Sequence, residues 1–246
     1  METRLTSPDR HARGLLGALP ESLRYEAVSR DPDDVAGKLA QFIPAGAKVL
    51  DVGCGTGSVS QLVAELSGAS LVGIEPDGER VAVARARGLN AYQGYLSGDF
   101  VRAHGPFDYV LFADVLEHLP SPATLVELAM EGLVSGGALL ASVPNVAQWF
   151  VRQELLRGNF DYEESGIMDA THLRWFTRRT ICEFFERLDL RVTAVDFTVG
   201  AWHPGYQQHA PWRWIRWRHR ASVVRRLVRL WPTLFGCQII VRAVKP

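Results

Sequence analysis

A chain of 246 residues is longer than one small domain needs, and one α/β domain with an insertion or a tail fits this length. Apolar residues make up 47% of it, enough for a well-buried core. No stretch approaches the roughly 18 to 20 apolar residues that would span a bilayer, and the first residues lack the apolar run of a secretory signal. The three cysteines have no paired spacing, so neither disulfides nor a cysteine-only zinc site is expected. We therefore expect a cytoplasmic protein.

The net charge of zero conceals an uneven distribution of charge along the chain. Residues 197–246 contain nine Lys or Arg and no Asp or Glu, so residues 1–196 carry a net charge of −9. Five of the seven tryptophans lie in the same basic segment. A basic segment that is separated from an acidic remainder in this way often indicates a surface that binds a partner.

Strands and helices alternate along the first part of the chain, where glycine, proline and polar residues separate apolar runs. In chain order, the predicted elements are a helix at 33–42, a strand at 48–52, a helix at 56–67, a strand at 70–75, a helix at 77–88, a short strand at 91–93, a strand at 107–113, a helix at 121–133 and a strand at 137–143. Asp77 is placed to cap the third helix and Gly88 to end it. This alternation predicts a parallel sheet with helices on both faces.

After Asn145 the pattern becomes less regular. The remaining predicted elements are helices at 146–157 and 178–188 and strands at 190–197 and 236–244. Residues 1–30 are interpreted as an N-terminal extension and residues 31–246 as one domain. Two insertions, at about 146–176 and 198–235, are predicted to face the substrate.

The stretch AKVLDVGCGTG, residues 47–57, is a short strand that leads into three glycines and then a helix. Glycines let the backbone approach a ligand closely, and the N-terminus of a helix carries partial positive charge. A dinucleotide fingerprint reads G-x-G-x-x-G, whereas Gly53, Gly55 and Gly57 alternate here and Asp51 precedes the turn. An acid is a poor neighbour for a pyrophosphate. It suits S-adenosylmethionine, which has no phosphate and carries an ammonium and a sulfonium.

The glycine motif, with Glu75 at the end of the next strand, resembles that of the class I (Rossmann-like) S-adenosylmethionine-dependent methyltransferases. The resemblance covers residues 45–145 well and the rest more loosely. It implies an α/β fold with a doubly wound, seven-stranded, mostly parallel sheet and helical insertions, so that residues 31–246 would form the methyltransferase domain. The residues that it assigns to S-adenosylmethionine at these motifs are Asp51, Gly53, Gly55, Gly57 and Glu75, the last through both ribose hydroxyls.

The sequence departs from the family at the adenine end of the cofactor. Many relatives have an Asp after the third strand, near the adenine amino group, but Tyr95 or Leu96 stands at that position here, and the nearest acid is Asp99. We therefore expect Leu96 to make an apolar contact with the adenine. Asp114, just past the fourth strand, completes the predicted cofactor-binding residues.

The stretch ADVLEHL places three potential ligands after the fourth strand, at the edge where open α/β folds bind ligands. Its acid-x-x-Glu-His pattern resembles that of ubiquinone-biosynthesis O-methyltransferases and of small-RNA 2′-O-methyltransferases. The resemblance implies that Asp114, Glu117 and His118 hold a divalent metal, Mg²⁺ or Mn²⁺, that orients the substrate hydroxyls. The alternative is that Glu117 pairs locally and that His118 lines the cofactor pocket without a metal.

A second group of candidate catalytic residues lies in DATHLRWFT, residues 169–177. Polar side chains in an irregular stretch are less easily explained by core packing than those on a regular element. His172 is a candidate general base, or a further ligand beside His118, and Asp169 is the acid that accompanies it. If no metal is held, His118 is also a candidate base. The alternative is that Asp169 and His172 brace the loop, with Thr177 capping the helix that follows.

The basic, tryptophan-rich segment 211–232 is predicted to be one helix with a proline at each end. Its apolar stripe recurs at three- and four-residue steps and consists of Trp214, Trp217, Ala221, Val224, Val228 and Trp231. A helix of this kind suits a lid that turns arginines toward a phosphorylated substrate, or the surface of an anionic membrane. Single-stranded nucleic acid is a third option, which the acidic remainder of the chain disfavours.

Together these features predict an enzyme that transfers a methyl group from S-adenosylmethionine to oxygen on a small or lipid-linked sugar, a glycolipid or a secondary metabolite. The Pro-Asn after the fifth strand and the THLRWFT stretch resemble methyltransferases of glycan and natural-product pathways. One alternative is a non-catalytic cofactor-binding module that docks on a membrane or on a glycan-assembly complex. Another is an RNA ribose 2′-O-methyltransferase. The location is predicted to be cytoplasmic, with contact to the inner face of the membrane as an option.

Overall fold

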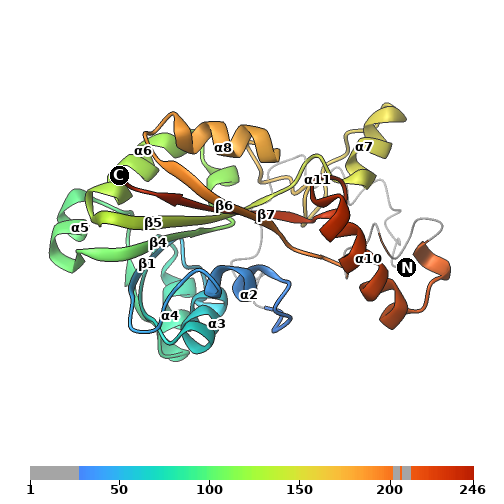
Figure 1. Ribbon diagram of the computed structural model, residues 1–246. Coiled ribbons are helices and arrows are strands. Elements are labelled where there is room, and N and C mark those ends of the chain that lie inside the picture. Colours follow the sequence, from blue (N-terminus) through green and yellow to red (C-terminus); the bar gives the residue numbers. More distant parts are fainter. Residues whose placement is uncertain (1–27, 202–205, 207–211) are drawn as a thin grey trace, which may run out of the picture.

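The centre of the molecule is one seven-stranded sheet (Figure 1). The computed structural model describes residues 28–201, 206 and 212–246. The strands are β1 (Lys48–Val52), β2 (Ser70–Glu75), β3 (Asn90–Gln93), β4 (Phe107–Ala113), β5 (Leu133–Pro144), β6 (Arg191–Phe197) and β7 (Gln238–Val244). Their order is β3-β2-β1-β4-β5-β7-β6, and β7 runs antiparallel to both of its neighbours while the other pairs are parallel. The predicted fold class is confirmed.

Helices cover both faces of the sheet. One face carries α2 (Val35–Ala40), α3 (Ser58–Ser67) and α4 (Gly78–Ala86), and the other carries α5 (Gly98–His104), α6 (Pro122–Glu131) and α8 (Arg178–Glu186). Toward the carboxyl ends of the parallel strands lie η1 (Leu116–His118), α7 (Trp149–Leu156), η2 (Trp212–Trp214), α10 (Trp217–Leu230) and α11 (Pro232–Phe235). Of the predicted N-terminal extension, residues 1–27 lie outside the described residues.

Two apolar layers hold the helices to the sheet. Successive residues of a strand point to opposite faces, so a strand buried on both sides is apolar throughout. In β4, Leu111 packs in the layer formed with α2, α3 and α4, whereas the next residue, Phe112, packs in the layer formed with α6 and α8. Both side chains are fully buried. The apolar runs that predicted the strands are therefore the residues that fix the two layers.

Local caps set the ends of the helices that flank the binding edge. The Asp77 carboxylate accepts hydrogen bonds from the backbone N–H groups of Glu79 and Arg80, which confirms it as the cap of α4. Gly88, just beyond the end of that helix, has a φ of 90°, a conformation that glycine adopts without strain. Thr177 forms a capping box with Thr180 at the start of α8.

Two parts of the sequence-based prediction were incomplete or wrong. The helix α5 was not predicted, because its seven residues give too short an apolar pattern to detect, although Ser97 caps it through the N–H of Phe100. The segment 211–232 is not one helix. Arg216 has an extended ψ of 140°, so α10 begins only after it, and the residue before Pro232 has left the helical region, as residues before proline commonly do.

No helix among the described residues has both the length and the apolar character needed to cross a bilayer.

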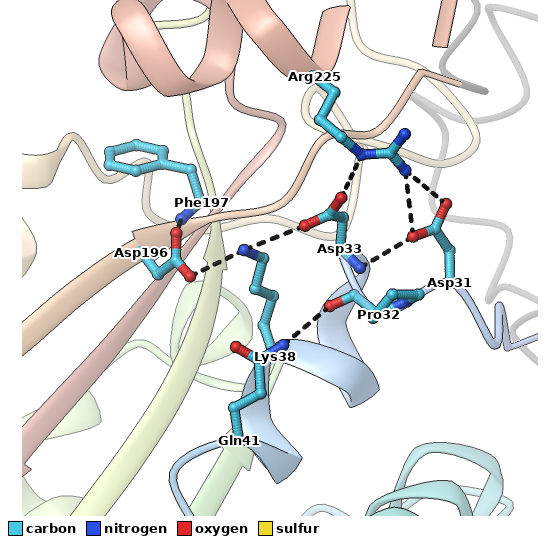
Figure 2. A network of polar contacts seen from close by, with 8 residues as sticks. All are labelled: Asp31, Pro32, Asp33, Lys38, Gln41, Asp196, Phe197 and Arg225. Carbon is cyan, nitrogen blue, oxygen red and sulfur yellow. Dashed lines mark hydrogen bonds and ion pairs between the residues drawn. The ribbon is translucent and has the colours of Figure 1, made fainter. Parts of the chain in front are cut away.

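Part of the basic C-terminal segment is held by acidic residues from the start of the domain (Figure 2). Arg225 of α10 donates to the carboxylates of Asp33 and Asp31, which precede α2. Lys38 of α2 lies 3.3 Å from Asp33 and 2.9 Å from Asp196 of β6. Although burial alone would raise it, these cations hold the pKa of Asp33 below its usual value. The opposite charges of the two parts of the chain therefore attach α10 to α2 and the sheet.

Arg225→Ala is expected to lower the free energy of unfolding by about 1 kcal/mol, since partly exposed ion pairs contribute about 0.2–1 kcal/mol each. Chemical denaturation of Arg225→Ala, Asp33→Ala and the double variant gives the coupling energy of the pair. This coupling energy should decrease with added salt. The matched control is Arg179 and Glu183, an exposed pair 2.8 Å apart within α8. A coupling between Arg225 and Asp33 no larger than that of the control would contradict the assignment.

Candidate active site

The turn after β1 has the backbone geometry of a ligand cradle. Gly53, Gly55 and Gly57 have φ values of 74°, 54° and 74°, which residues with a side chain rarely adopt. A Cβ on Gly53 would lie 2.8 Å from Val115, so this position has no room for a side chain. A Cβ on Gly55 would meet no atom within 4 Å, so this glycine borders open space that a ligand can occupy.

The structure brings Glu75 to the same turn. Its side chain is 4% exposed, and its two carboxylate oxygens accept hydrogen bonds from the backbone N–H groups of Gly55 and Asp77, each at 3.1 Å. A carboxylate has about four lone-pair positions, so two N–H groups leave capacity to accept two hydroxyl protons. The position and remaining capacity of Glu75 fit the ribose-binding role that the sequence assigned to it.

Asp51 is buried beneath the turn, with 1% of its surface exposed. One carboxylate oxygen accepts a hydrogen bond from the Ser60 hydroxyl at 2.5 Å, and the other has no partner among the described residues. Burial and the negative charge of Glu75 raise the pKa of Asp51 to about 7, against the opposing effect of the Ser60 hydrogen bond. A buried carboxylate in this state is stabilised by a nearby cation, such as the ammonium of S-adenosylmethionine.

Asp114 has a φ of 55° at the end of β4, and its carboxylate is already engaged. One oxygen accepts from the Ser142 hydroxyl at 2.9 Å and from the Gln238 side-chain amide at 2.7 Å. Burial raises its pKa, while these hydrogen bonds act in the opposite direction.

Leu96 is buried in the core layer of α5 and α6, and Asp99 pairs with Arg102 at the surface. Contacts of Asp114 and Leu96 with the cofactor stay predictions.

The centre of the candidate site is a cluster of Glu117, His118 and His172. One potential ligand atom from each side chain lies within 4.8 Å of the other two, and the imidazole centroids are 4.8 Å apart. Glu117 is 1% exposed, and neither of its carboxylate oxygens has a hydrogen-bond partner among the described residues. Burial raises its pKa well above the ordinary value, as do the charges of Asp114 and Asp169. An unpartnered buried carboxylate is costly unless it is protonated or binds a cation.

The structure therefore groups His172, rather than Asp114, with the other two members of the predicted metal set. The Nδ1 atom of His172 lies 3.1 Å from the carbonyl oxygen of Ile167, so the neutral ring donates from Nδ1 and presents Nε2 as an acceptor. His118 uses Nδ1 in the same way, 3.2 Å from the carbonyl oxygen of Thr171. Such contacts fix imidazole orientation at metal sites.

The loop that carries His172 is fastened to η1 by the backbone. The carbonyl oxygen of Glu117 accepts from the N–H groups of Leu173 and Arg174, at 2.8 and 3.1 Å. Asp169 is fully buried and accepts from the backbone N–H and the hydroxyl of Thr171, at 2.8 and 2.7 Å. These contacts support the bracing interpretation of Asp169, and its predicted catalytic role stays a prediction.

Residues that sequence reasoning missed also lie at the end of β5, just past it and at the start of β7. Gln148 is fully buried, and neither the nitrogen nor the oxygen of its amide has a hydrogen-bond partner among the described residues. Ser142 and Gln238 hold Asp114, as described above. The only sequence signal for Gln148 was its position just past the carboxyl end of a strand.

Comparison with known proteins identifies the class that this fold and site define. A family model described as "Methyltransferase domain" matches residues 24–195, and the chain belongs to this family. A ubiquinone biosynthesis O-methyltransferase of Psychrobacter cryohalolentis is 32% identical over 168 residues, which are 60% of this chain and 62% of that protein. The match thus spans about three-fifths of the length of that curated relative.

Solved structures show the same fold. A SAM-dependent methyltransferase from Archaeoglobus fulgidus superposes with a TM-score of 0.59 at 18% identity, covering 87% of this chain and 95% of that one. The [4+2]-cyclase SpnF superposes with a TM-score of 0.54 at 19% identity, covering 87% and 81%. At these identities the likeness establishes the class I methyltransferase fold, which supports S-adenosylmethionine as the cofactor, and does not establish the acceptor.

Asp51→Asn tests the environment of the buried acid. The pKa of Asp51 is about 7 in the folded chain, against an ordinary value of 3.8. Protonation of Asp51 therefore stabilises the folded chain. This stabilisation is complete below pH 3.8 and is lost as the pH rises toward 7. Between pH 4 and pH 8 the wild type should lose about 1–4 kcal/mol of unfolding free energy relative to Asp51→Asn. Urea unfolding at the two pH values measures this difference, and Asp99→Asn is the exposed control. Equal pH dependence in the wild type and Asp51→Asn would contradict it.

Glu75→Ala is expected to weaken binding of S-adenosylhomocysteine by about 1–3 kcal/mol, because two buried ribose hydroxyls lose a charged acceptor. Isothermal titration calorimetry measures the affinity. Glu75→Gln separates lost charge from a disturbed turn, since it retains an oxygen acceptor, and Glu79→Ala is the exposed control on α4. An affinity unchanged in Glu75→Ala would remove this residue from the cofactor site.

Proposed function

We propose that this chain is an S-adenosylmethionine-dependent O-methyltransferase that acts on a hydroxyl of a sugar, a glycolipid or a secondary metabolite. The observation that carries the proposal is the buried carboxylate of Glu117 beside the imidazoles of His118 and His172, with no hydrogen-bond partner among the described residues. It lies just past β4, at the sheet edge that also carries the glycine turn and Glu75. A group that binds or deprotonates a hydroxyl is what oxygen methylation needs at that edge.

The residues of the cofactor end have separate tasks. Bound S-adenosylmethionine supplies an electrophilic methyl group on a sulfonium. Gly55 borders the open space at the turn, and Glu75 has capacity for the ribose hydroxyls. The ammonium would favour loss of the proton from Asp51 and attract the resulting charge, one oxygen of which has no partner among the described residues. Holding the nucleophile and the methyl group in line can account for much of the rate enhancement.

The residues of the acceptor end fit a divalent cation. Glu117 offers an anionic oxygen, and His118 and His172 are oriented by carbonyl groups at Nδ1, as metal-bound histidines usually are. A cation held by these three side chains would orient the acceptor hydroxyl and lower its pKa. One carboxylate and two imidazoles favour Mn²⁺ over Mg²⁺, because Mg²⁺ prefers oxygen ligands. Without a cation, Nε2 of His172 is the group that can accept the proton of the hydroxyl.

The choice of an oxygen acceptor rests on likeness as well as on geometry. The curated relative is named an O-methyltransferase, and its match covers about three-fifths of its length. The fold alone does not establish methyl transfer, since a [4+2]-cyclase shares it. Formation of S-adenosylhomocysteine with an added acceptor would separate the enzyme from a non-catalytic binding module.

Glu117→Gln and His172→Ala are expected to reduce turnover by about 10²- to 10⁴-fold, as the loss of a group that deprotonates the nucleophile usually does. A panel of phenols, catechols, sugars and glycolipids, assayed for S-adenosylhomocysteine release, provides the acceptor. EDTA should abolish turnover, and Mn²⁺ should restore it better than Mg²⁺. Leu173→Ala is the matched loop control, because its side chain is 56% exposed on the same loop.

The outcomes separate the two chemical roles of the cluster. Full activity in EDTA, together with a large loss in His172→Ala, would replace the metal by a simple histidine base. Full activity of both Glu117→Gln and His172→Ala would contradict a catalytic role of the cluster.

A further inference from the structure

The helix α10 has a second stripe that faces away from the domain. Its inner side packs on the core through Val224, Val228 and Leu227, which uses part of the apolar stripe predicted from the sequence. The outward stripe follows three- and four-residue steps along one line of the helix and consists of the exposed residues Arg216, His219, Val223, Arg226 and Leu230. Leu230 is 66% exposed and Val223 is 38% exposed.

Two tryptophans flank the outward stripe. Trp214 precedes α10 and is 70% exposed, and Trp231 follows it and is 56% exposed. Both belonged to the predicted apolar stripe, but the breaks at Arg216 and before Pro232 keep them out of the core. Figure 1 shows α10 at one end of the molecule, beside α11 and far from α5. The outward stripe and the two tryptophans therefore form an apolar and basic surface at one end of the domain.

The charge of this surface has one sign. Arg216 and Arg226 make no ion pair with any residue in the described part of the chain, and residues 197–246 contain no acid at all. Arg225, which does pair with Asp31 and Asp33, lies on the flank of the helix that faces α2. Acidic residues near the start of the domain thus bind one flank of α10, and no described acid pairs with the arginines of the outward stripe.

We propose that the outward stripe and its two tryptophans bind the surface of an anionic lipid bilayer. A helix with a basic and aliphatic face flanked by tryptophans suits the boundary between headgroups and acyl chains, where indole rings are favoured and arginines meet lipid phosphates. A second copy of this chain fits poorly, since a two-fold interface would place arginines against arginines. Nucleic acid would leave the aliphatic Val223 and Leu230 without apolar contacts.

The consequence is a fixed orientation of the domain at the membrane. Because Arg225 and Lys38 attach α10 to α2 and β6, docking of the helix would hold the whole sheet in one position against the bilayer. Docking of this kind would determine where the protein is located and does not depend on the identity of the acceptor. Its test therefore uses binding and no turnover.

Sedimentation of the full-length chain with vesicles tests this surface. Vesicles of phosphatidylcholine alone are compared with vesicles that also contain phosphatidylglycerol, at low and high salt. We expect binding to the anionic vesicles, weakened by salt. Arg226→Ala should lower the affinity at low salt by about five-fold, the effect of one arginine near an anionic surface. Arg226→Lys should retain it. Leu230→Ala should lower it at both salt concentrations.

The matched controls are Arg102→Ala on α5, which is exposed and lies far from α10, and Leu66→Ala on α3, which is an exposed leucine outside the outward stripe. Neither should change vesicle binding, and thermal unfolding should show that all variants fold. No binding to anionic vesicles would overturn the proposal. An equal loss of vesicle binding in Arg102→Ala and Arg226→Ala would also overturn it, because it would show general charge attraction. Binding of single-stranded RNA in place of vesicles would overturn it as well.

Discussion

The burial of the Glu117 carboxylate is the constraint on which the rest of the site depends. The side chain is 1% exposed and neither oxygen is hydrogen-bonded to a described residue, which is costly for a charged group. The chain nevertheless fixes this position firmly, because the backbone oxygen of the same residue binds the loop that carries His172. A site that holds a costly group so rigidly is prepared for a cation or for the proton of an acceptor.

The two halves of the charge distribution have different uses in the fold. Acids near the start of the domain hold Arg225 and so fix the position of α10. At the sheet edge, by contrast, Asp51 and Glu117 are buried with oxygens that no described residue satisfies. The acids of the first group stabilise the fold, and those of the second remain available to ligands. Part of the predicted separation of charge is therefore used inside the fold, where it attaches α10 to α2.

Strong local patterns made most of the fold predictable from the sequence. The strands β1, β2 and β4 have the predicted bounds because each is an apolar run ended by glycine, proline or an acid. The cofactor turn was predictable for the same reason, since Gly53 to Gly57 and Glu75 lie close to one another along the chain. The approach of His172 to Glu117 depends on long-range packing, which no local pattern encodes. Periodicity also predicted the stripe of segment 211–232, but not that Trp214 and Trp231 would leave it, which backbone conformation decides.

The central claim is that Glu117, His118 and His172 form one site for a cation at the sheet edge that also carries the glycine turn. Anomalous diffraction from crystals grown with S-adenosylhomocysteine and Mn²⁺ tests it most directly. We expect a manganese peak bonded to all three side chains, at distances of about 2.0–2.3 Å. Cofactor bound at the glycine turn with no manganese at these residues, and with the Glu117 carboxylate hydrogen-bonded only to protein or water, would contradict it.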